Sequence, residues 1–180
     1  QPASALWNLG QLASCLTLVC DVDPLEKALE GFEPAYRAAF RRRMLAVLGL
    51  QPLSEEGDLT LLKALFGWMG ETRASWPQVF FDWFCGPASE ARAGASPLAP
   101  LYRVPAFDPV RRALLEHRPE RPERLGHAYF AGPAPASLVI EEVEAVWARI
   151  AEADDWGPFQ THMARIEAAR QAFALAPEAD

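Results

Sequence analysis

The chain has 180 residues, of which 51% are hydrophobic and 23% charged, and this is an ordinary size for one domain. Its apolar content is enough for a core and excludes a chain that is disordered throughout. The formal net charge of −7 disfavours nucleic acid as a partner, because nucleic-acid-binding proteins present a basic surface. No apolar run is long enough and free enough of charges to predict a transmembrane helix, so no membrane partner is expected.

The beginning of the chain is unusual. It opens on Gln1-Pro2, with no Met and no charged segment ahead of an apolar run, so we expect a piece of a longer protein and not a signal peptide. Cys15, Cys20 and Cys85 make an odd number of cysteines without a C-x-x-C pair. Free thiols in a reducing, cytoplasmic compartment are therefore expected.

The first 50 residues predict three helices. Apolar residues recur at steps of three and four along residues 4–20, which is typical of a helix with one buried face. Asp23-Pro24 has the form of a helix start, and Gly31 is expected to end that helix. A third helix is expected over residues 34–48.

Two further helices are expected before residue 85. Residues 58–69 are apolar nearly all round, which predicts a buried central helix that Gly70 ends. A short aromatic helix should follow over residues 75–84. Its aromatic residues are more than one helical stripe can bury, so we expect most in the core and some in an interface. They are Trp76, Phe80, Phe81, Trp83 and Phe84.

The middle of the chain is rich in proline. Residues 85–135 hold nine of the sixteen prolines, which exclude long helices there, and a loop-rich segment with one helix over residues 108–117 is expected. Five arginines alternate with acidic residues in and after this helix, so they should pair locally. The arginines are Arg111, Arg112, Arg118, Arg121 and Arg124, and the acidic residues are Asp108, Glu116, Glu120 and Glu123.

Two helices are predicted at the end of the chain. Ser137 should cap the first, with its large apolar residues turned inward, and Asp154-Asp155 should end it. Pro158 should begin the second. The inward residues are expected to be Val139, Val143, Val146, Trp147 and Ile150 in the first helix, and Phe159, Met163, Ile166 and Phe173 in the second.

These elements predict an all-α fold of about seven helices with a proline-rich, loop-rich middle. We divide the chain into a helical subdomain over residues 1–85, a connecting region with one helix over 86–136, a C-terminal helical pair over 137–175, and a frayed tail over 176–180.

The residues themselves do not form a self-sufficient active site. The sequence has no glycine-rich phosphate loop, G-x-S-x-G or H-E-x-x-H motif, and its three histidines are dispersed. We expect the glutamates Glu141, Glu142 and Glu144 to lie in the solvated first turn of a helix, where the helix dipole favours acidic side chains. We expect His162 to have a structural role. We therefore assign no catalytic, cofactor-binding or metal-binding residue to this chain.

The strongest functional signal is a resemblance at the start of the chain. The pattern Gln1-Pro2-x4-Trp7-Asn8-Leu9-x2-Leu12-Ala13 closely resembles a signature of the selenoprotein O / YdiU family. Several later stretches are similar to family counterparts, closely to about residue 85 and more loosely to about residue 173. They are Tyr36-x3-Phe40, Met44-x3-Leu48-Gly49-Leu50, residues 58–69 and residues 80–83.

The resemblance implies a kinase-fold protein adenylyltransferase that transfers AMP from ATP to Ser, Thr or Tyr hydroxyls with the help of Mg or Mn. In the family this signature follows the catalytic core, so the ATP- and metal-binding residues would lie upstream of Gln1. The chain would then be a C-terminal helical part that supports the upstream kinase-like lobe, and the protein substrates would be partners of the whole protein. Trp7, Leu9, Leu62 and Trp83 are the packing residues we expect to matter.

The sequence is also compatible with two other classes of function. A stand-alone helical interaction module would use the aromatic patch as a groove for a partner. A helical ligand-binding domain of a regulator would hold a small molecule in a pocket lined by tryptophans.

Overall fold

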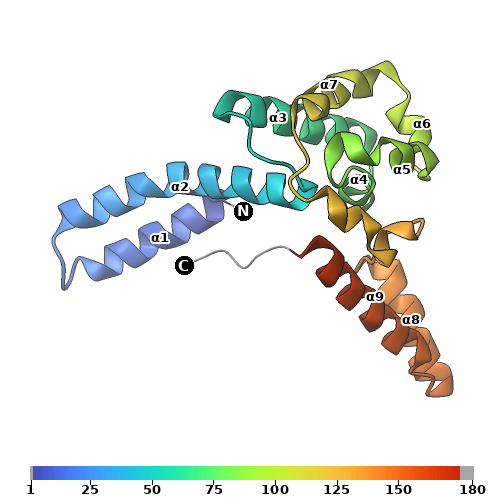
Figure 1. Ribbon diagram of the computed structural model, residues 1–180. Helices are drawn as coiled ribbons and strands as arrows, with labels where there is room; N and C mark the ends of the chain where they lie inside the picture. The colour runs from blue at the N-terminus through green and yellow to red at the C-terminus, as the bar shows by residue number, and fades with distance from the viewer. Residues whose placement is uncertain (1, 175–180) are drawn as a thin grey trace. The chain divides into compact units, whose positions relative to one another are not determined.

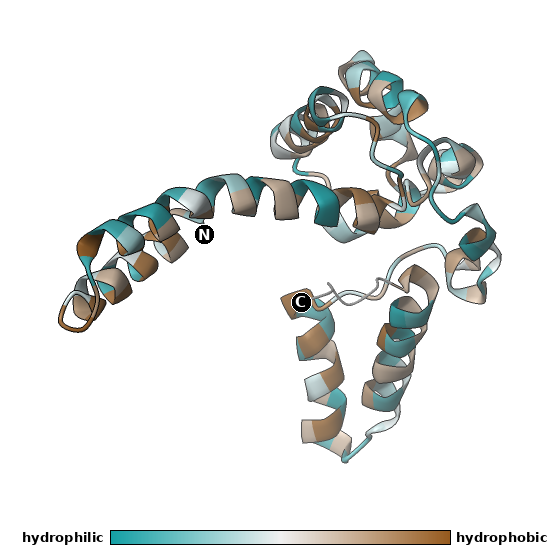
Figure 2. Ribbon diagram, turned by 60° about the vertical axis from the view of Figure 1, so that its left-hand side comes forward, coloured by the Kyte–Doolittle hydropathy of each residue, from teal (hydrophilic) through white to brown (hydrophobic). Residues whose placement is uncertain are grey.

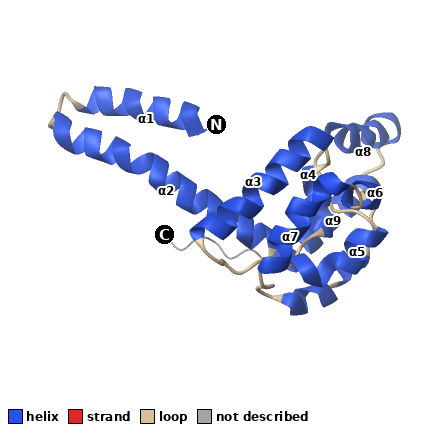
Figure 3. Cartoon of the chain, turned by 90° about the horizontal axis from the view of Figure 1, so that it is seen from above, coloured by secondary structure: helices blue, strands red, loops and turns tan. Residues whose placement is uncertain are grey.

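The computed structural model describes residues 2–174, and the expected frayed tail at 176–180 lies outside this range (Figure 1). The described part consists of helices joined by loops and turns, and Figure 3 shows no strand in it. Its one β-type pairing is an isolated bridge between Leu50 and Pro119. The all-α prediction is confirmed, although short helices raise the number above the seven expected. The α-helices are α1 (Pro2–Leu16), α2 (Val22–Leu48), α3 (Glu55–Thr72), α4 (Trp76–Asp82), α5 (Glu90–Ala95), α6 (Ala99–Tyr102), α7 (Asp108–Glu116), α8 (Ile140–Ala153) and α9 (Gly157–Phe173).

The chain forms two compact units, Gln1–Arg43 and Met44–Asp180. The boundary falls inside α2, whose last turns contribute Leu45 and Leu48 to the core of the second unit. The four parts expected from the sequence, at 1–85, 86–136, 137–175 and 176–180, are a different division and stay a prediction.

The first unit is a helical hairpin in which α1 runs back along the N-terminal part of α2 (Figure 1). Here the predicted break at Gly31 and Pro34 is wrong, because α2 continues through both residues. The rings of Phe32 and Tyr36 stack across Pro34 at a centroid distance of 5.9 Å, and Phe40 extends the stack. Such contacts between residues four apart favour a continuous helix by about 0.2–0.5 kcal/mol each, which is less than the roughly 3 kcal/mol that a proline inside a helix costs.

The second unit is built around α3, which is the buried central helix that the sequence predicted. Its buried residues include Leu61, Leu65 and Trp68, which pack in one cluster with side chains from the end of α2, from α4 and from α7. Gly70 does not end α3, because the helix continues to Thr72. Burial of the preceding turn outweighs the cost of about 1 kcal/mol that an interior glycine imposes on a helix.

A second aromatic cluster joins the aromatic helix to the end of the chain. Phe84 stacks on Phe130 at 4.9 Å between ring centroids and meets Phe173 of α9 edge-on at 5.0 Å. Gly49 takes a φ of +63°, and a Cβ there would stand 2.7 Å from the Phe84 ring. This turn therefore requires glycine both for its backbone angle and for space.

The proline-rich middle is more ordered than expected. The predicted helix at 108–117 is confirmed as α7, but α5, α6 and four 3₁₀ turns also form there. Proline occupies the first or second position of several of these short elements. Proline has no backbone N–H, and the first turn of a helix makes no intrahelical hydrogen bond with that group. Proline is therefore well tolerated at the start of these short helices, although it prevents long ones.

The C-terminal pair consists of α8 and α9, joined by a turn at Asp154 as expected. Two details differ from the prediction. Ser137 does not cap α8, since its hydroxyl donates to Glu142 at 2.8 Å and the helix begins after Val139. Trp147 does not turn inward, because it is 64% exposed. The inward orientation predicted for Val139, Val143, Phe159 and Met163 is also wrong, since all four are exposed.

Candidate functional site

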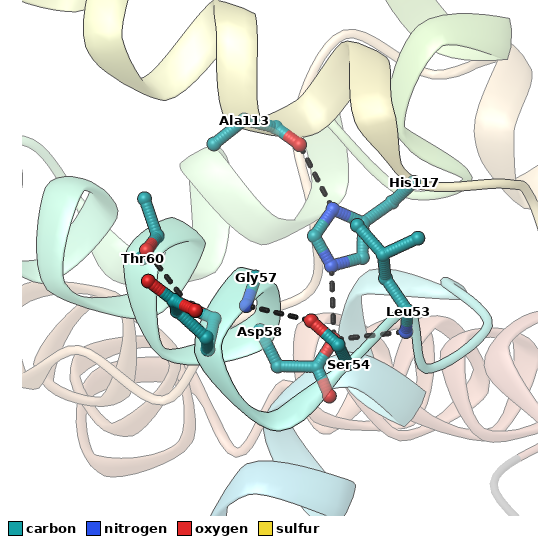
Figure 4. A network of polar contacts seen from close by, with 8 residues as sticks. Leu53, Ser54, Gly57, Asp58, Thr60, Ala113 and His117 are labelled. Carbon is teal, nitrogen blue, oxygen red and sulfur yellow. Dashed lines mark hydrogen bonds and ion pairs between the residues drawn. The ribbon is translucent and has the colours of Figure 1, made fainter.

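Two residues 59 positions apart form a buried pair between α3 and α7 (Figure 4). Asp58 lies in the first turn of α3 and His117 follows the last residue of α7, and the two side chains are 2% and 0% exposed. The His117 Nδ1–H donates to the carbonyl of Ala113 at 2.8 Å, and Nε2 lies 3.1 Å from Asp58 Oδ1. Asp58 Oδ1 also accepts from the backbone N–H of Leu53 at 3.0 Å.

This Asp–His geometry resembles that of a catalytic base and its orienting carboxylate, but its surroundings do not. Catalysis would require a nucleophile or substrate within hydrogen-bond reach of the ring. Instead, both ring nitrogens of His117 face groups of the fold. The pair therefore fixes the end of α7 against the start of α3.

A second buried carboxylate, Asp82, lies at the end of α4 and is 1% exposed. It accepts hydrogen bonds from Gln78 Nε2 at 2.8 Å, from Tyr102 Oη at 2.7 Å and from the hydroxyl of Ser96. Burial, together with the neighbouring Asp82 charge, raises the pKa of Tyr102 far above its ordinary value. The phenol is thus held in its donating form, and the cluster joins α4 to α6.

Arg92 closes the end of the aromatic helix. Its Nη2 donates to the Phe84 carbonyl at 3.3 Å and to Ser89 Oγ at 2.9 Å. The guanidinium carbon lies 5.1 Å from the centroid of the Phe81 ring and 4.7 Å from that of Phe130. Burial lowers the pKa of Arg92, and the nearby Asp82 charge opposes that shift. A cation on the last carbonyls of a helix is a favourable capping arrangement, so Arg92 has a structural role.

A cavity of about 270 Å³ lies beside this guanidinium, and residues of the aromatic cluster line it. Its lining combines the rings of Phe81 and Phe130 with the polar side chains of Asp82, Arg92 and Ser96. Among residues 2–174, no group of three or more His, Cys, Asp or Glu side chains converges in a way that could hold a metal ion.

The aromatic set from the sequence is mostly core, as expected. Phe80, Phe81, Trp83 and Phe84 are buried, whereas Trp76 is 51% exposed and packs against Phe66 and Phe80 at its edge. Of the four expected packing residues, Leu62 and Trp83 are buried, and Trp7 and Leu9 are exposed.

The predicted local pairing of the five arginines is wrong. In the described part of the chain none of them bonds to the carboxylate of Asp108, Glu116, Glu120 or Glu123. Arg111 instead pairs with Glu90, while Arg121 and Arg124 donate to carbonyls near the end of α9. Tertiary contacts between distant segments decide these partners, so alternation of charge along the sequence could not reveal them.

The cysteines are free, with Cys15 and Cys20 exposed and Cys85 buried. Burial raises the pKa of the Cys85 thiol, which makes it a poor nucleophile. Of the predicted first-turn glutamates, Glu142 faces His162 across α8 and α9 at 3.8 Å. Within the described residues no helix has the length and apolar character needed to cross a membrane.

The first unit presents an apolar face. None of the residues of α1 is buried, although the helix carries a stripe of large apolar side chains. Trp7 is 65% and Leu12 55% exposed, while Leu6, Leu9 and Leu16 are each 38% exposed. The four leucines follow one another at helical spacing on one side of α1, and Trp7 lies on another side; exposed apolar residues of this kind are a mark of an interaction surface.

Comparison with known proteins shows which family this chain resembles. The family described as "Protein adenylyltransferase SelO" matches residues 1–101. The protein nucleotidyltransferase YdiU of Gloeobacter violaceus is 31% identical over 98% of this chain and 37% of its own length. The proteins of the same name from Vibrio atlanticus and Myxococcus xanthus are 38% and 35% identical over 44% and 60% of this chain, and over 16% and 22% of their own lengths.

The chain thus spans little more than a third of the length of the Gloeobacter relative. No solved structure matches it. The family match covers more than half of the chain and includes the whole of α1, with its exposed stripe. The chain belongs to the SelO family, whose relatives compared above are named protein nucleotidyltransferases.

Proposed function

We propose that this chain is the C-terminal helical part of a protein adenylyltransferase and that it supports a kinase-like catalytic lobe that precedes it. The whole protein would transfer AMP from ATP to Ser, Thr or Tyr hydroxyls of protein substrates. Membership in the SelO family and the fraction of the relatives' length that the chain spans support this proposal.

ATP and Mg or Mn belong to the rest of the protein in this proposal. The described residues do not fit these groups, because they bring together no acidic cluster for a metal, and the sequence has no glycine-rich phosphate loop. In this proposal, residues 2–174 contribute no reacting group. They support the catalytic lobe.

The observation that carries this role is the exposed stripe on α1. The large apolar residues of α1 are 38–65% exposed, so the helix still has apolar surface to bury, and most helical stability in proteins comes from packing such a face. Trp7 and Leu12 would gain most from being covered. Nucleotidyl transfer depends on positioning and electrostatic stabilisation, so a lobe buttressed by such a helix would hold its reactive groups more accurately.

Two assays test the proposal. Residues 1–180 incubated with ATP labelled at the α-phosphate, in Mg²⁺ or Mn²⁺, should label neither themselves nor added proteins, while the full-length protein should label its substrates. In the full-length protein, Trp7→Glu should lower the rate of transfer at least tenfold. Leu18→Glu is the matched control, since Leu18 is 88% exposed beyond the end of α1.

Labelling by residues 1–180 alone would place the active site in this chain and overturn the proposal. Equal rates for the Trp7 and Leu18 variants would remove the supporting role of α1. We further expect the protein to act in the cytoplasm, where its three free cysteines would stay reduced. Nucleic acid and membrane are not among the partners we propose.

A further inference from the structure

The C-terminal pair carries a second apolar surface, on helices that lie beyond the matched family region at residues 1–101. The large apolar side chains of α8 and α9 that remain solvated are Ile140, Val143, Trp147, Phe159 and Met163, with Trp156 next to α9, and we call them the hairpin face. Trp147 is 64%, Ile140 62% and Trp156 49% exposed. Figure 2 shows hydrophobic segments alternating with hydrophilic ones along both helices.

The hairpin face is separate from the seam between the two helices. The seam holds an open cleft of about 400 Å³ that is lined by residues of both helices, among them Glu142, Ala145 and Val146 of α8 and Thr161 and His162 of α9. Glu142 and His162 face each other across it at 3.8 Å. The largest apolar side chains of the two helices point elsewhere.

Helical geometry places these side chains on one side of the pair. On α8, Val143 follows the seam residue Glu142 by one position, and on α9, Met163 follows the seam residue His162 by one position. One position is a rotation of about 100° about the helix axis. In two antiparallel helices, equal rotations away from a shared seam lead to the same side, so the apolar residues of α8 and α9 form a continuous face.

A second copy of the same helix pair offers a matching apolar surface to cover this face. The arginines of the pair already have partners within the chain, since Arg149 pairs with Asp155, Arg170 pairs with Glu167 and Arg165 donates to the Pro135 carbonyl. A second copy related by a two-fold axis parallel to the helices would set α8 against the partner's α9 through apolar contacts. That arrangement makes all neighbouring helices antiparallel, as in a four-helix bundle.

The size of the face suits such a pairing. Each of the three aromatic side chains offers roughly 100 Å² at these exposures, on a scale of about 150–250 Å² for a fully buried aromatic residue. With the three aliphatic side chains and the stems of flanking charged residues, the face approaches the roughly 800 Å² that each partner contributes to a standard interface.

We propose that this chain forms a homodimer in which two α8–α9 hairpins pack through their hairpin faces as an antiparallel four-helix bundle. The proposal does not depend on the proposed function, because it concerns helices other than α1 and requires no catalytic lobe.

The test is the mass of residues 1–180 in solution, measured by sedimentation equilibrium from 1 to 100 μM. We expect twice the chain mass of 19.9 kDa at the upper concentrations. Trp147→Glu and Met163→Glu should each raise the dissociation constant of the dimer at least 100-fold. The helical circular dichroism signal of both variants should match that of the unsubstituted chain. Leu115→Glu is the matched control, since Leu115 is 57% exposed on α7, and should leave the dimer intact.

A monomer at 100 μM would overturn the proposal and indicate that another part of the longer protein covers the hairpin face. A dimer that survives both glutamate substitutions would also overturn it, because association would then run through another surface. Neither result bears on the nucleotidyltransferase assay, so failure here and failure of the proposed function can be told apart.

Discussion

Removal of the His117 imidazole tests the buried pair that joins α7 to α3. In His117→Ala, Asp58 loses one donor and keeps the Leu53 N–H, while Ala113 loses the donor to its carbonyl. Leaving a buried polar group without its partner costs about 1–3 kcal/mol, and more where the group is charged. Two buried groups lose a partner here, the Asp58 carboxyl and the Ala113 carbonyl, so we expect about 3 kcal/mol.

The measurement is the free energy of unfolding in urea at neutral pH, followed by circular dichroism and by tryptophan fluorescence. His127→Ala is the matched control, because that ring accepts a single hydrogen bond, from the N–H of Tyr129. It should cost about 1 kcal/mol or less. A double-mutant cycle with Asp58→Ala should give a coupling of about 1–3 kcal/mol.

The reasoning is refuted if His117→Ala costs no more than His127→Ala. A coupling near zero would show that the two side chains of the pair stabilise the fold independently, and the assignment of a joint role would then be wrong.

Three further predictions concern the core of the second unit. Burial raises the pKa of Tyr102 above its ordinary value of 10.0, so its hydroxyl stabilises the fold below that pH, and stability should fall as pH rises above it; Tyr102→Phe should flatten this alkaline loss in urea unfolding curves. Gly49→Ala should cost about 2 kcal/mol or more, from a left-handed backbone and contact with Phe84, whereas Gly70→Ala, with open space around it, should be neutral or stabilising by up to about 1 kcal/mol in the same curves. A colorimetric thiol reagent should modify two cysteines quickly and Cys85 only as the protein unfolds; fast reaction of all three would contradict its burial.

The sequence predicted much of the fold because its local signals were strong. The apolar run of α3 and the Asp-Pro start of α7 depend on neighbouring residues alone, and both were recognised. The break at Gly31 was predicted from an equally local rule but did not form, because α2 continues through Gly31 and Pro34, and aromatic rings stack across Pro34. Propensity is a weak guide where packing contributes more than the roughly 1 kcal/mol of a glycine penalty.

The buried polar contacts were beyond prediction from this one sequence. Asp58 and His117 are 59 residues apart, and Asp82 and Tyr102 are 20 apart, and neither pair has a motif that announces it. For Asp82 the signal that could have drawn attention to it is that it is the one charged residue of α4, because such a residue needs a partner when buried.

By itself, the sequence determined the helical class, the buried central helix and the family, because helical periodicity and a short signature are properties of neighbouring residues. The tertiary structure decided which apolar residues the fold uses. Leu62 and Trp83 are buried in it, whereas Trp7 of α1 and Trp147 of α8 stay exposed. All four fit an apolar pattern equally well, and only packing in three dimensions separates a side chain that completes a core from one that remains available to a partner.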